Sequence, residues 1–111
     1  MGGDHGPPVI LPAAVKAIQL HPDVHFTLCG DEDTIKAGIQ PLTNAERNRV
    51  TIVHCSQVVE MGEAPTSALR NKKDSSMRRV IELVESGEAN ACVSAGNTGA
   101  LLTLSFYLLK T

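Results

Sequence analysis

The sequence predicts an α/β fold in which a mainly parallel sheet is covered by helices on both faces. Segments with helical periodicity alternate along the chain with short runs of β-branched residues. Parallel strands need crossover connections, and helices are the usual ones. The length of 111 residues allows one domain with a single hydrophobic core.

The composition excludes several classes of protein. A hydrophobic content of 42% with a net charge of −2 argues against intrinsic disorder, and one Tyr, two Phe and no basic excess argue against a nucleic-acid-binding module. Cys29, Cys55 and Cys92 are an odd number without a C-x-x-C motif, so neither a disulfide framework nor a zinc ribbon is indicated. We expect buried, reduced thiols in a cytoplasmic protein.

The first half of the chain predicts two helices and a strand between them. Residues 12–20 predict a helix that begins near Pro12, because proline is tolerated in a first turn, and that ends before Pro22. Residues 25–29 predict a short strand. Residues 31–39 predict a helix whose acidic first turn suits the positive end of the helix dipole.

The second half predicts two further strands and three helices. Residues 49–55 (RVTIVHC) predict a strand, and residues 66–71 one or two helical turns. Residues 75–85 form the clearest helix, with apolar positions spaced i, i+3, i+4 and i+7 after a capping serine. Residues 91–95 (ACVSA) predict a third strand, which leads through a Gly-Asn-Thr-Gly turn into an apolar helix over 100–109.

Both ends of the sequence are atypical of a complete domain. A Gly-rich loop normally follows a strand, yet no strand precedes residues 1–4. The apolar helix over 100–109 has neither a cap nor a following strand. We therefore expect residues 1–111 to be a partial domain, the N-terminal part of a larger one.

The sharpest candidate site is the segment 94–100 (SAGNTGA), between a predicted strand and a predicted helix. The free N–H groups at a helix start, with the helix dipole, favour an anion such as phosphate. Gly96 and Gly99 let the backbone approach a ligand closely, and Asn97 and Thr98 can donate side-chain hydrogen bonds. A capped turn without a ligand is an equally good interpretation of these residues alone.

Positive charge concentrates between Arg70 and Arg79, which span five of the ten Lys and Arg residues. This charge surrounds a second hydroxyl-capped helix start at Ser75 and Ser76. A phosphate, or the acidic face of a carrier protein, is favoured in such a place. The residues alone favour the alternative of a solvated helix end.

The opening residues 2–7 (GGDHGP) place Asp4 between glycines, where it can face a ligand. His5 is a weak indication of a metal or a catalytic base, because no second ligand lies at a motif spacing. We predict no metal site.

Three motifs together resemble the N-terminal part of the bacterial phosphate acyltransferases of phospholipid synthesis, the PlsX family. They are residues 1–7 (MGGDHGP), residues 73–77 (KDSSM) and residues 91–100 (ACVSAGNTGA), in the order of the family. The resemblance covers the whole chain and implies a three-layer α/β/α sandwich similar to isocitrate and isopropylmalate dehydrogenases, without metal or nucleotide cofactors. Family members have a strand before the first motif and continue well beyond Thr111.

The resemblance implies transfer of a fatty acyl group from acyl-[acyl carrier protein] to inorganic phosphate, giving acyl phosphate for a membrane-bound glycerol-3-phosphate acyltransferase. It also implies a cytoplasmic homodimer with peripheral membrane association. Phosphate is itself the nucleophile, so no Ser-His-Asp triad is needed. Asp4 would orient a donor or relay a proton, and Lys73 would supply charge. The expected substrate-binding residues are Ser75, Ser76, Ser94, Gly96, Asn97, Thr98 and Gly99.

Two alternatives belong to other classes. One is a phosphate acetyl- or butyryltransferase on a similar fold, and the other is a non-catalytic phosphate-binding fragment. A dinucleotide-dependent dehydrogenase is disfavoured, because the sequence lacks a G-x-G-x-x-G fingerprint followed by an acidic residue.

Overall fold

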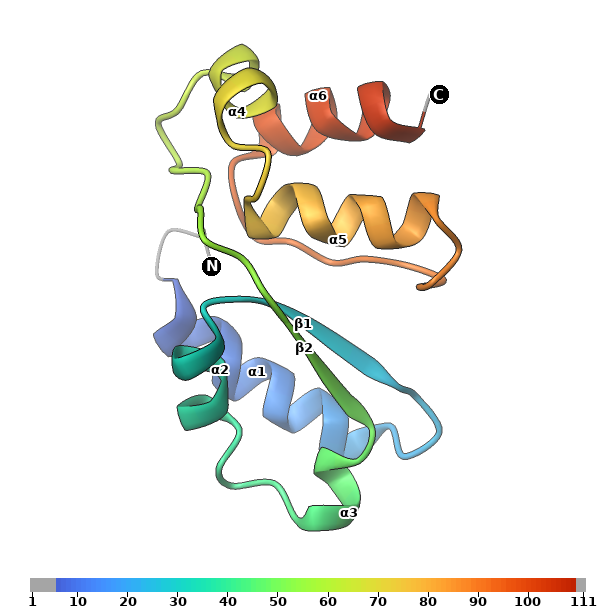
Figure 1. Cartoon of the computed structure of the whole chain (residues 1–111). Coiled ribbons are helices and arrows are strands. Elements are labelled where there is room, and N and C mark those ends of the chain that lie inside the picture. Colours follow the sequence, from blue (N-terminus) through green and yellow to red (C-terminus); the bar gives the residue numbers. More distant parts are fainter. Residues whose placement is uncertain (1–5, 110–111) are drawn as a thin grey trace.

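Two parallel strands lie between layers of helices in the computed structural model, which describes residues 6–109 (Figure 1). The strands are β1 (Phe26–Gly30) and β2 (Val50–His54). Parallel pairing requires the chain to cross back between them, and it does so through α2 (Glu32–Gly38) and the short α3 (Asn44–Arg47). The predicted α/β class with a parallel sheet is confirmed.

Helix α1 (Pro7–Leu20) begins five residues earlier than the sequence predicted. Gly6 precedes it with a φ of 62°, and two prolines occupy the first two helical positions, where a missing N–H costs nothing. Pro12 therefore lies inside the helix, and the prediction that it starts the helix is wrong. The Pro7-Pro8 pair is the stronger start signal, because it fixes φ at two consecutive residues.

Helices α1 and α2 cover one face of the sheet and form the first hydrophobic cluster. The even-numbered residues of the strands point into it. The buried members of this cluster are Leu11, Val15, Ile18, Ile35, Ile39 and Leu42, and the strand residues packed against them are Phe26, Leu28, Val50 and Ile52.

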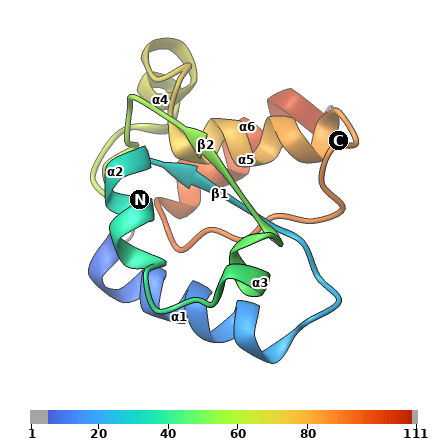
Figure 2. The same cartoon turned by 60° about the horizontal axis from the view of Figure 1, so that its bottom comes forward.

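Helix α5 (Ser76–Glu85) lies over the opposite face of β1, and α6 (Thr98–Leu109) packs on α5 and on α4 (Pro65–Asn71) (Figures 1 and 2). These helices form a second cluster, so the prediction of a single core is wrong. A sheet covered on both faces buries apolar side chains on each side separately. The buried members of the second cluster are Val59, Ala68, Met77, Ile81, Ala100 and Leu104.

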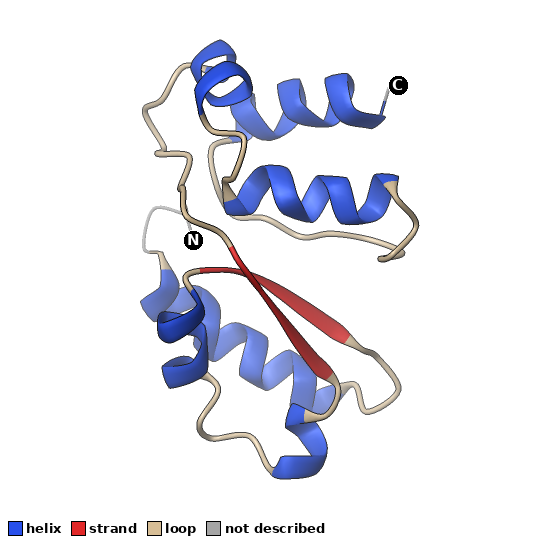
Figure 3. Cartoon of the chain, viewed as in Figure 1, coloured by secondary structure: helices blue, strands red, loops and turns tan. Residues whose placement is uncertain are grey.

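Residues 91–95 form no strand, which corrects the sequence prediction (Figure 3). Val93 is 94% exposed, and residues 93–96 line a cavity beside β1 instead of pairing with it. A β-strand is stabilised by its ladder of hydrogen bonds and by cross-strand side-chain pairs, and residue preference does not replace them. This segment runs extended between α5 and α6 within the described part of the chain.

Candidate functional site

The starts of α5 and α6 lie beside one cavity at the carboxyl end of β1. The cavity has a volume of about 210 Å³ and lies between α1, β1, α5 and the segment before α6. Ser76 reaches it from the start of α5, and Ser94 and Gly96 reach it from the segment before α6. In parallel sheets this is the end at which ligands bind.

Ser75 caps α5 and is fully buried. Its hydroxyl oxygen accepts a hydrogen bond of 3.1 Å from the backbone N–H of Arg78, which satisfies one of the free donors in the first turn. The cap fixes the direction of the chain where α5 begins. Ser75 therefore positions its neighbour Ser76, which is 6% exposed and lines the cavity.

The segment before α6 also carries its own local hydrogen bond. The backbone N–H of Gly96 donates to the hydroxyl oxygen of Ser94 over 3.1 Å. Both residues are half-buried, and both line the cavity. The Ser94 hydroxyl donates to no acceptor among residues 6–109 and is available to a ligand.

Asn97 caps α6 and is 7% exposed. Its side-chain oxygen accepts a hydrogen bond of 3.1 Å from the backbone N–H of Ala100. Its side-chain nitrogen donates to the carbonyl oxygens of Glu60, at 3.0 Å, and Glu63, at 2.7 Å. The sequence predicts that the Asn97 side-chain N–H groups donate to phosphate. In the structure these groups instead hold the start of α6 against the loop after β2.

Thr98 and Gly99 form the exposed first turn of α6. A hydrogen bond to an earlier carbonyl begins with Leu101, whose N–H donates to the Asn97 carbonyl oxygen over 2.9 Å. The N–H groups of Thr98 and Gly99 have no acceptor among residues 6–109. A β-carbon on Gly99 would approach the ring of Pro65 to 3.1 Å, so this glycine also permits α6 to pack on α4.

The two lysines before α5 differ in their surroundings. Lys72 is half-buried, and its Nζ donates to the carbonyl oxygen of Val58 over 2.9 Å and lies 3.5 Å from a Glu63 carboxylate oxygen. Lys73 is exposed and contacts no acceptor in the described part of the chain. Of the two lysines, Lys73 is therefore the one whose ammonium is not engaged by an acceptor within residues 6–109.

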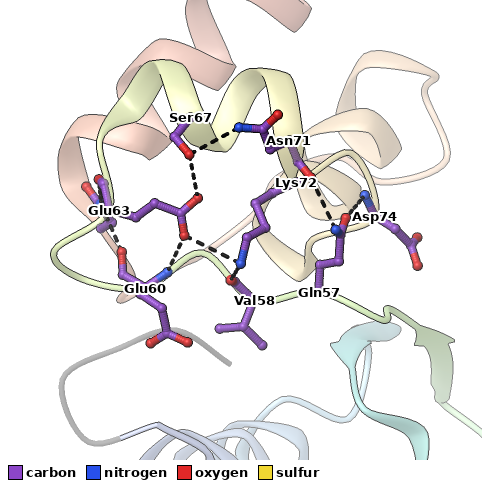
Figure 4. A network of polar contacts seen from close by, with 9 residues as sticks. Gln57, Val58, Glu60, Glu63, Ser67, Asn71, Lys72 and Asp74 are labelled. Atoms are coloured by element: carbon purple, nitrogen blue, oxygen red, sulfur yellow. Dashed lines mark hydrogen bonds and ion pairs between the residues drawn. The ribbon is translucent and has the colours of Figure 1, made fainter.

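A polar network holds the loop after β2 against α4 (Figure 4). The Glu63 carboxylate forms an ion pair with Lys72 and accepts a hydrogen bond of 3.5 Å from the Ser67 hydroxyl. Asn71 extends this network. Its side-chain nitrogen donates to the Ser67 hydroxyl oxygen, and its backbone carbonyl oxygen accepts a hydrogen bond from the Gln57 side chain. The network and the Asn97 cap act on the same loop, so this loop links the starts of α5 and α6.

Asp74 ends the turn before α5 and carries a lowered pKa. The Ser56 hydroxyl donates to its carboxylate over 2.6 Å and the Ser56 backbone N–H over 2.9 Å, and both bonds favour the ionised form and lower the pKa. The Asp74 backbone also pairs with Gln57. Asp74 is therefore an anion that ties the helix start to the end of β2.

The structure brings some of the predicted site residues together and separates others. Three of them, Ser76, Ser94 and Gly96, line the same cavity. Asp4 lies outside the described residues. The side chains of Ser75 and Asn97 are directed into the fold as caps.

Two features of this region were not anticipated from the sequence. The sequence alone does not distinguish the neighbouring Lys72 and Lys73. Only Lys72 donates to the carbonyl oxygen of Val58, which lies fourteen residues earlier in the chain. The prediction that all the cysteines are buried is wrong: Cys55 is buried, Cys29 is half-buried and Cys92 is exposed. Cys92 is exposed because residues 91–95 do not join the sheet.

None of the helices in residues 6–109 has the length and apolar character needed to cross a membrane.

Comparison with known proteins identifies the family. Residues 1–111 match the model of a family described as fatty acid synthesis protein. A phosphate acyltransferase of Halorhodospira halophila is 53% identical over 111 residues, which are all of this chain and 32% of that protein. Phosphate acyltransferases of Methylococcus capsulatus and Legionella pneumophila are 49% and 52% identical over all of this chain and 33% and 32% of those proteins. The chain spans about a third of the length of the curated relatives it matches. Because the family model matches all of its residues, the chain belongs to the fatty acid synthesis protein family.

Proposed function

We propose that the whole protein transfers a fatty acyl group from acyl-[acyl carrier protein] to inorganic phosphate and so forms acyl phosphate for phospholipid synthesis. The observation that carries this proposal is the cavity shared by Ser76, Ser94 and Gly96 beside two helix starts. Hydroxyl and backbone donors at helix starts are suited to a phosphate. The names of the relatives support acyl transfer to that acceptor.

The reaction needs positioning more than a protein nucleophile. A phosphate oxygen attacks the thioester carbonyl carbon, a carbon–oxygen bond forms, and the carbonyl oxygen becomes an oxyanion. The oxyanion then re-forms the carbonyl as the carbon–sulfur bond breaks, and the departing thiolate takes up, through water, the proton that the attacking phosphate releases. The protein accelerates these steps by holding phosphate against the carbonyl and by directing donors at the oxyanion.

The site residues divide into those that contact phosphate and those that position the helix starts. The proposed contacts are the Ser76 and Ser94 hydroxyls and the backbone N–H groups of Thr98 and Gly99, and Gly96 lets the backbone approach phosphate closely. These groups line the cavity or carry N–H groups without an acceptor in residues 6–109. The caps Ser75 and Asn97 hold these donors in place through their own hydrogen bonds.

Charged groups complete the proposed site. Lys73 is exposed and supplies positive charge at the start of α5, where a phosphate would be attracted. Asp4 orients a donor toward phosphate. The basic stretch from Arg70 to Arg79 is the proposed contact for the acidic face of the acyl carrier protein.

The assembly and location of the whole protein follow from the family resemblance. We propose a cytoplasmic homodimer that associates peripherally with the membrane, where a membrane-bound glycerol-3-phosphate acyltransferase consumes its product. Acyl phosphates are reactive mixed anhydrides, so proximity to the consuming enzyme limits their loss to water.

The test is an assay of the purified whole protein with phosphate and one of two acyl donors. We expect a long-chain acyl-[acyl carrier protein] to be consumed and acyl phosphate to appear in equal amount. Preferential consumption of acetyl- or butyryl-coenzyme A would replace the proposal with a short-chain phosphate acyltransferase. Stabilisation by phosphate without turnover of either donor would leave only a phosphate-binding protein.

A further inference from the structure

Strand β1 has one edge that no strand among residues 6–109 covers. It pairs with β2 along its other edge. The Phe26 N–H and the Gly30 carbonyl oxygen each form a hydrogen bond of 2.8 Å with a residue flanking β2. Alternate residues of a strand in a parallel ladder direct their N–H and C=O groups to the same neighbour, so those of Thr27 and Cys29 face the uncovered edge.

The cavity at this edge offers the surroundings of a buried strand. Thr27 and Cys29 line it from β1. Apolar side chains of both hydrophobic clusters also line it, Leu11 and Ile35 from the first and Met77 from the second. A strand inside a parallel sheet meets this combination, with backbone groups at its sides and apolar side chains against both of its faces.

The backbone groups at the uncovered edge distinguish between the possible occupants. Unpaired N–H and C=O groups beside apolar side chains cost free energy, and a fatty acyl chain has no groups that could pair with them. An extended peptide supplies donors and acceptors in turn and fills the apolar space with its side chains. Residues 93–96 line the same cavity without pairing with β1, which leaves the place beside β1 open to a strand.

We propose that a strand from the remaining part of the whole protein lies parallel to β1 in this cavity and pairs with Thr27 and Cys29. The chain spans 32% of a relative's length, so a protein of that length has ample further sequence to supply the strand. A partner for all of β1 needs about five residues. Because helices cover both faces of the sheet, we expect a run rich in Val, Ile and Leu.

The added strand leaves the proposed phosphate contacts at its end. The Ser76 N–H donates to the carbonyl oxygen of Gln57 over 3.2 Å, and Gln57 follows the last residue of β2 by three positions. Ser76 is therefore at the carboxyl end of the sheet, where ligands of parallel sheets bind. The strand takes the apolar part of the cavity, and its presence does not depend on the acyl-transfer function.

The test is hydrogen exchange of the purified whole protein at the level of single residues. We expect the N–H groups of Thr27 and Cys29 to exchange as slowly as that of Leu28, which faces β2 and is the control within the same strand. NOEs between amide protons identify the covering segment. In a sample that mixes labelled and unlabelled subunits, we expect this segment to lie outside residues 1–111 and in the same subunit.

A pair of variants tests the occupancy of the cavity by the sign of the effect. Ala14 lines the cavity from α1, and the neighbouring Ala13 is exposed. Beside a strand the added carbons overpack, so we expect Ala14→Leu to lower the Tm of the whole protein and Ala13→Leu to leave it unchanged. In an empty cavity the same carbons fill space and raise the Tm. The exchange rates of the wild-type protein stand without the variants.

Each of four results would overturn the proposal. Exchange of the Thr27 and Cys29 N–H groups about a hundredfold or more faster than that of Leu28 would show an open edge. Protection that appears only with added phosphate or acyl donor would assign the cavity to a ligand. NOEs to a second subunit, or to residues 93–96 alone, would assign the edge to a different partner. A Tm raised by Ala14→Leu would show an unfilled cavity.

Discussion

The side chain of Asn97 donates a hydrogen bond of 2.7 Å to the carbonyl oxygen of Glu63, thirty-four residues earlier in the chain. The same nitrogen donates to the carbonyl oxygen of Glu60, and the side-chain oxygen caps α6. The buried Asn97 side chain thus joins the start of α6 to the loop after β2, which the Lys72 ammonium also contacts. This joint fixes one wall of the cavity.

Replacement of this amide should loosen the start of α6. We expect Asn97→Ala to lower the free energy of unfolding by about 2 to 3 kcal/mol, because it removes a cap and leaves two loop carbonyls without their donor. Urea unfolding measures the change, and amide hydrogen exchange should be fastest in the first turn of α6. Asn90→Ala is the matched control, because Asn90 is exposed. Equal stability of the two variants would show that the joint is not important for folding.

Gly38 marks the close approach of α2 to α1. A β-carbon at this position would lie 2.6 Å from Leu11 Cδ1 and 3.0 Å from Leu11 Cβ. We expect Gly38→Ala to lower the free energy of unfolding by about 1 to 3 kcal/mol through overpacking. Gly62→Ala is the control, because a β-carbon there would have no neighbour within 4 Å. A Gly38→Ala protein as stable as the control would contradict this packing of α1 on α2.

Arg49 satisfies the carboxyl end of α1 across the sequence. Its guanidinium donates to the carbonyl oxygens of Ile18, His21 and Val24 at 2.8, 2.9 and 3.1 Å. Because the donor is charged, we expect Arg49→Ala to lower the free energy of unfolding by about 1.5 to 3 kcal/mol. Arg49→Lys should recover only part of the loss, since an ammonium lacks the planar fork. Arg70→Ala is the control, because Arg70 is exposed. A similar loss of unfolding free energy in this control would show that the effect of Arg49→Ala comes from the lost charge alone.

The bonds from Ser56 predict how Asp74 responds to acid. The folded-state pKa of Asp74 is below its ordinary value, so Asp74 stabilises the fold above the unfolded-state pKa, and this contribution is lost as the pH falls through the folded-state pKa. We expect Ser56→Ala to raise the pKa of Asp74 toward its ordinary value. Carboxyl titration by NMR measures it. The control is Asp31, whose pKa is lowered by its own hydrogen bonds from Thr34 and should stay unchanged. An unchanged pKa of Asp74 would contradict the assignment of its lowered pKa to Ser56.

Local signals predicted the elements that depend on local contacts. The capping serine and the apolar spacing of α5 fixed its place, and Asp31 caps α2 where an acidic first turn was expected. The short α3 was missed although Thr43 and Glu46 form a capping box, because a four-residue helix has no apolar period to detect.

Contacts distant in sequence account for the remaining differences. Residues 91–95 have the composition of a strand but no ladder partner among residues 6–109. Asn97 was expected to donate to a ligand, and its donors instead bind carbonyls on another loop. Composition shows that a side chain can donate, but the fold decides which acceptor it meets.

The most direct test of the central claim is the phosphate KM of the purified whole protein and of its Ser76→Ala variant. Ser76 lines the cavity, and its loss removes a hydrogen bond to a charged ligand, so the account predicts a KM for phosphate raised by about tenfold or more, with the KM for the acyl donor little changed. Ser86→Ala, at the other end of α5, should match the wild type. An unchanged phosphate KM in a folded Ser76→Ala protein would contradict the placement of phosphate in this cavity.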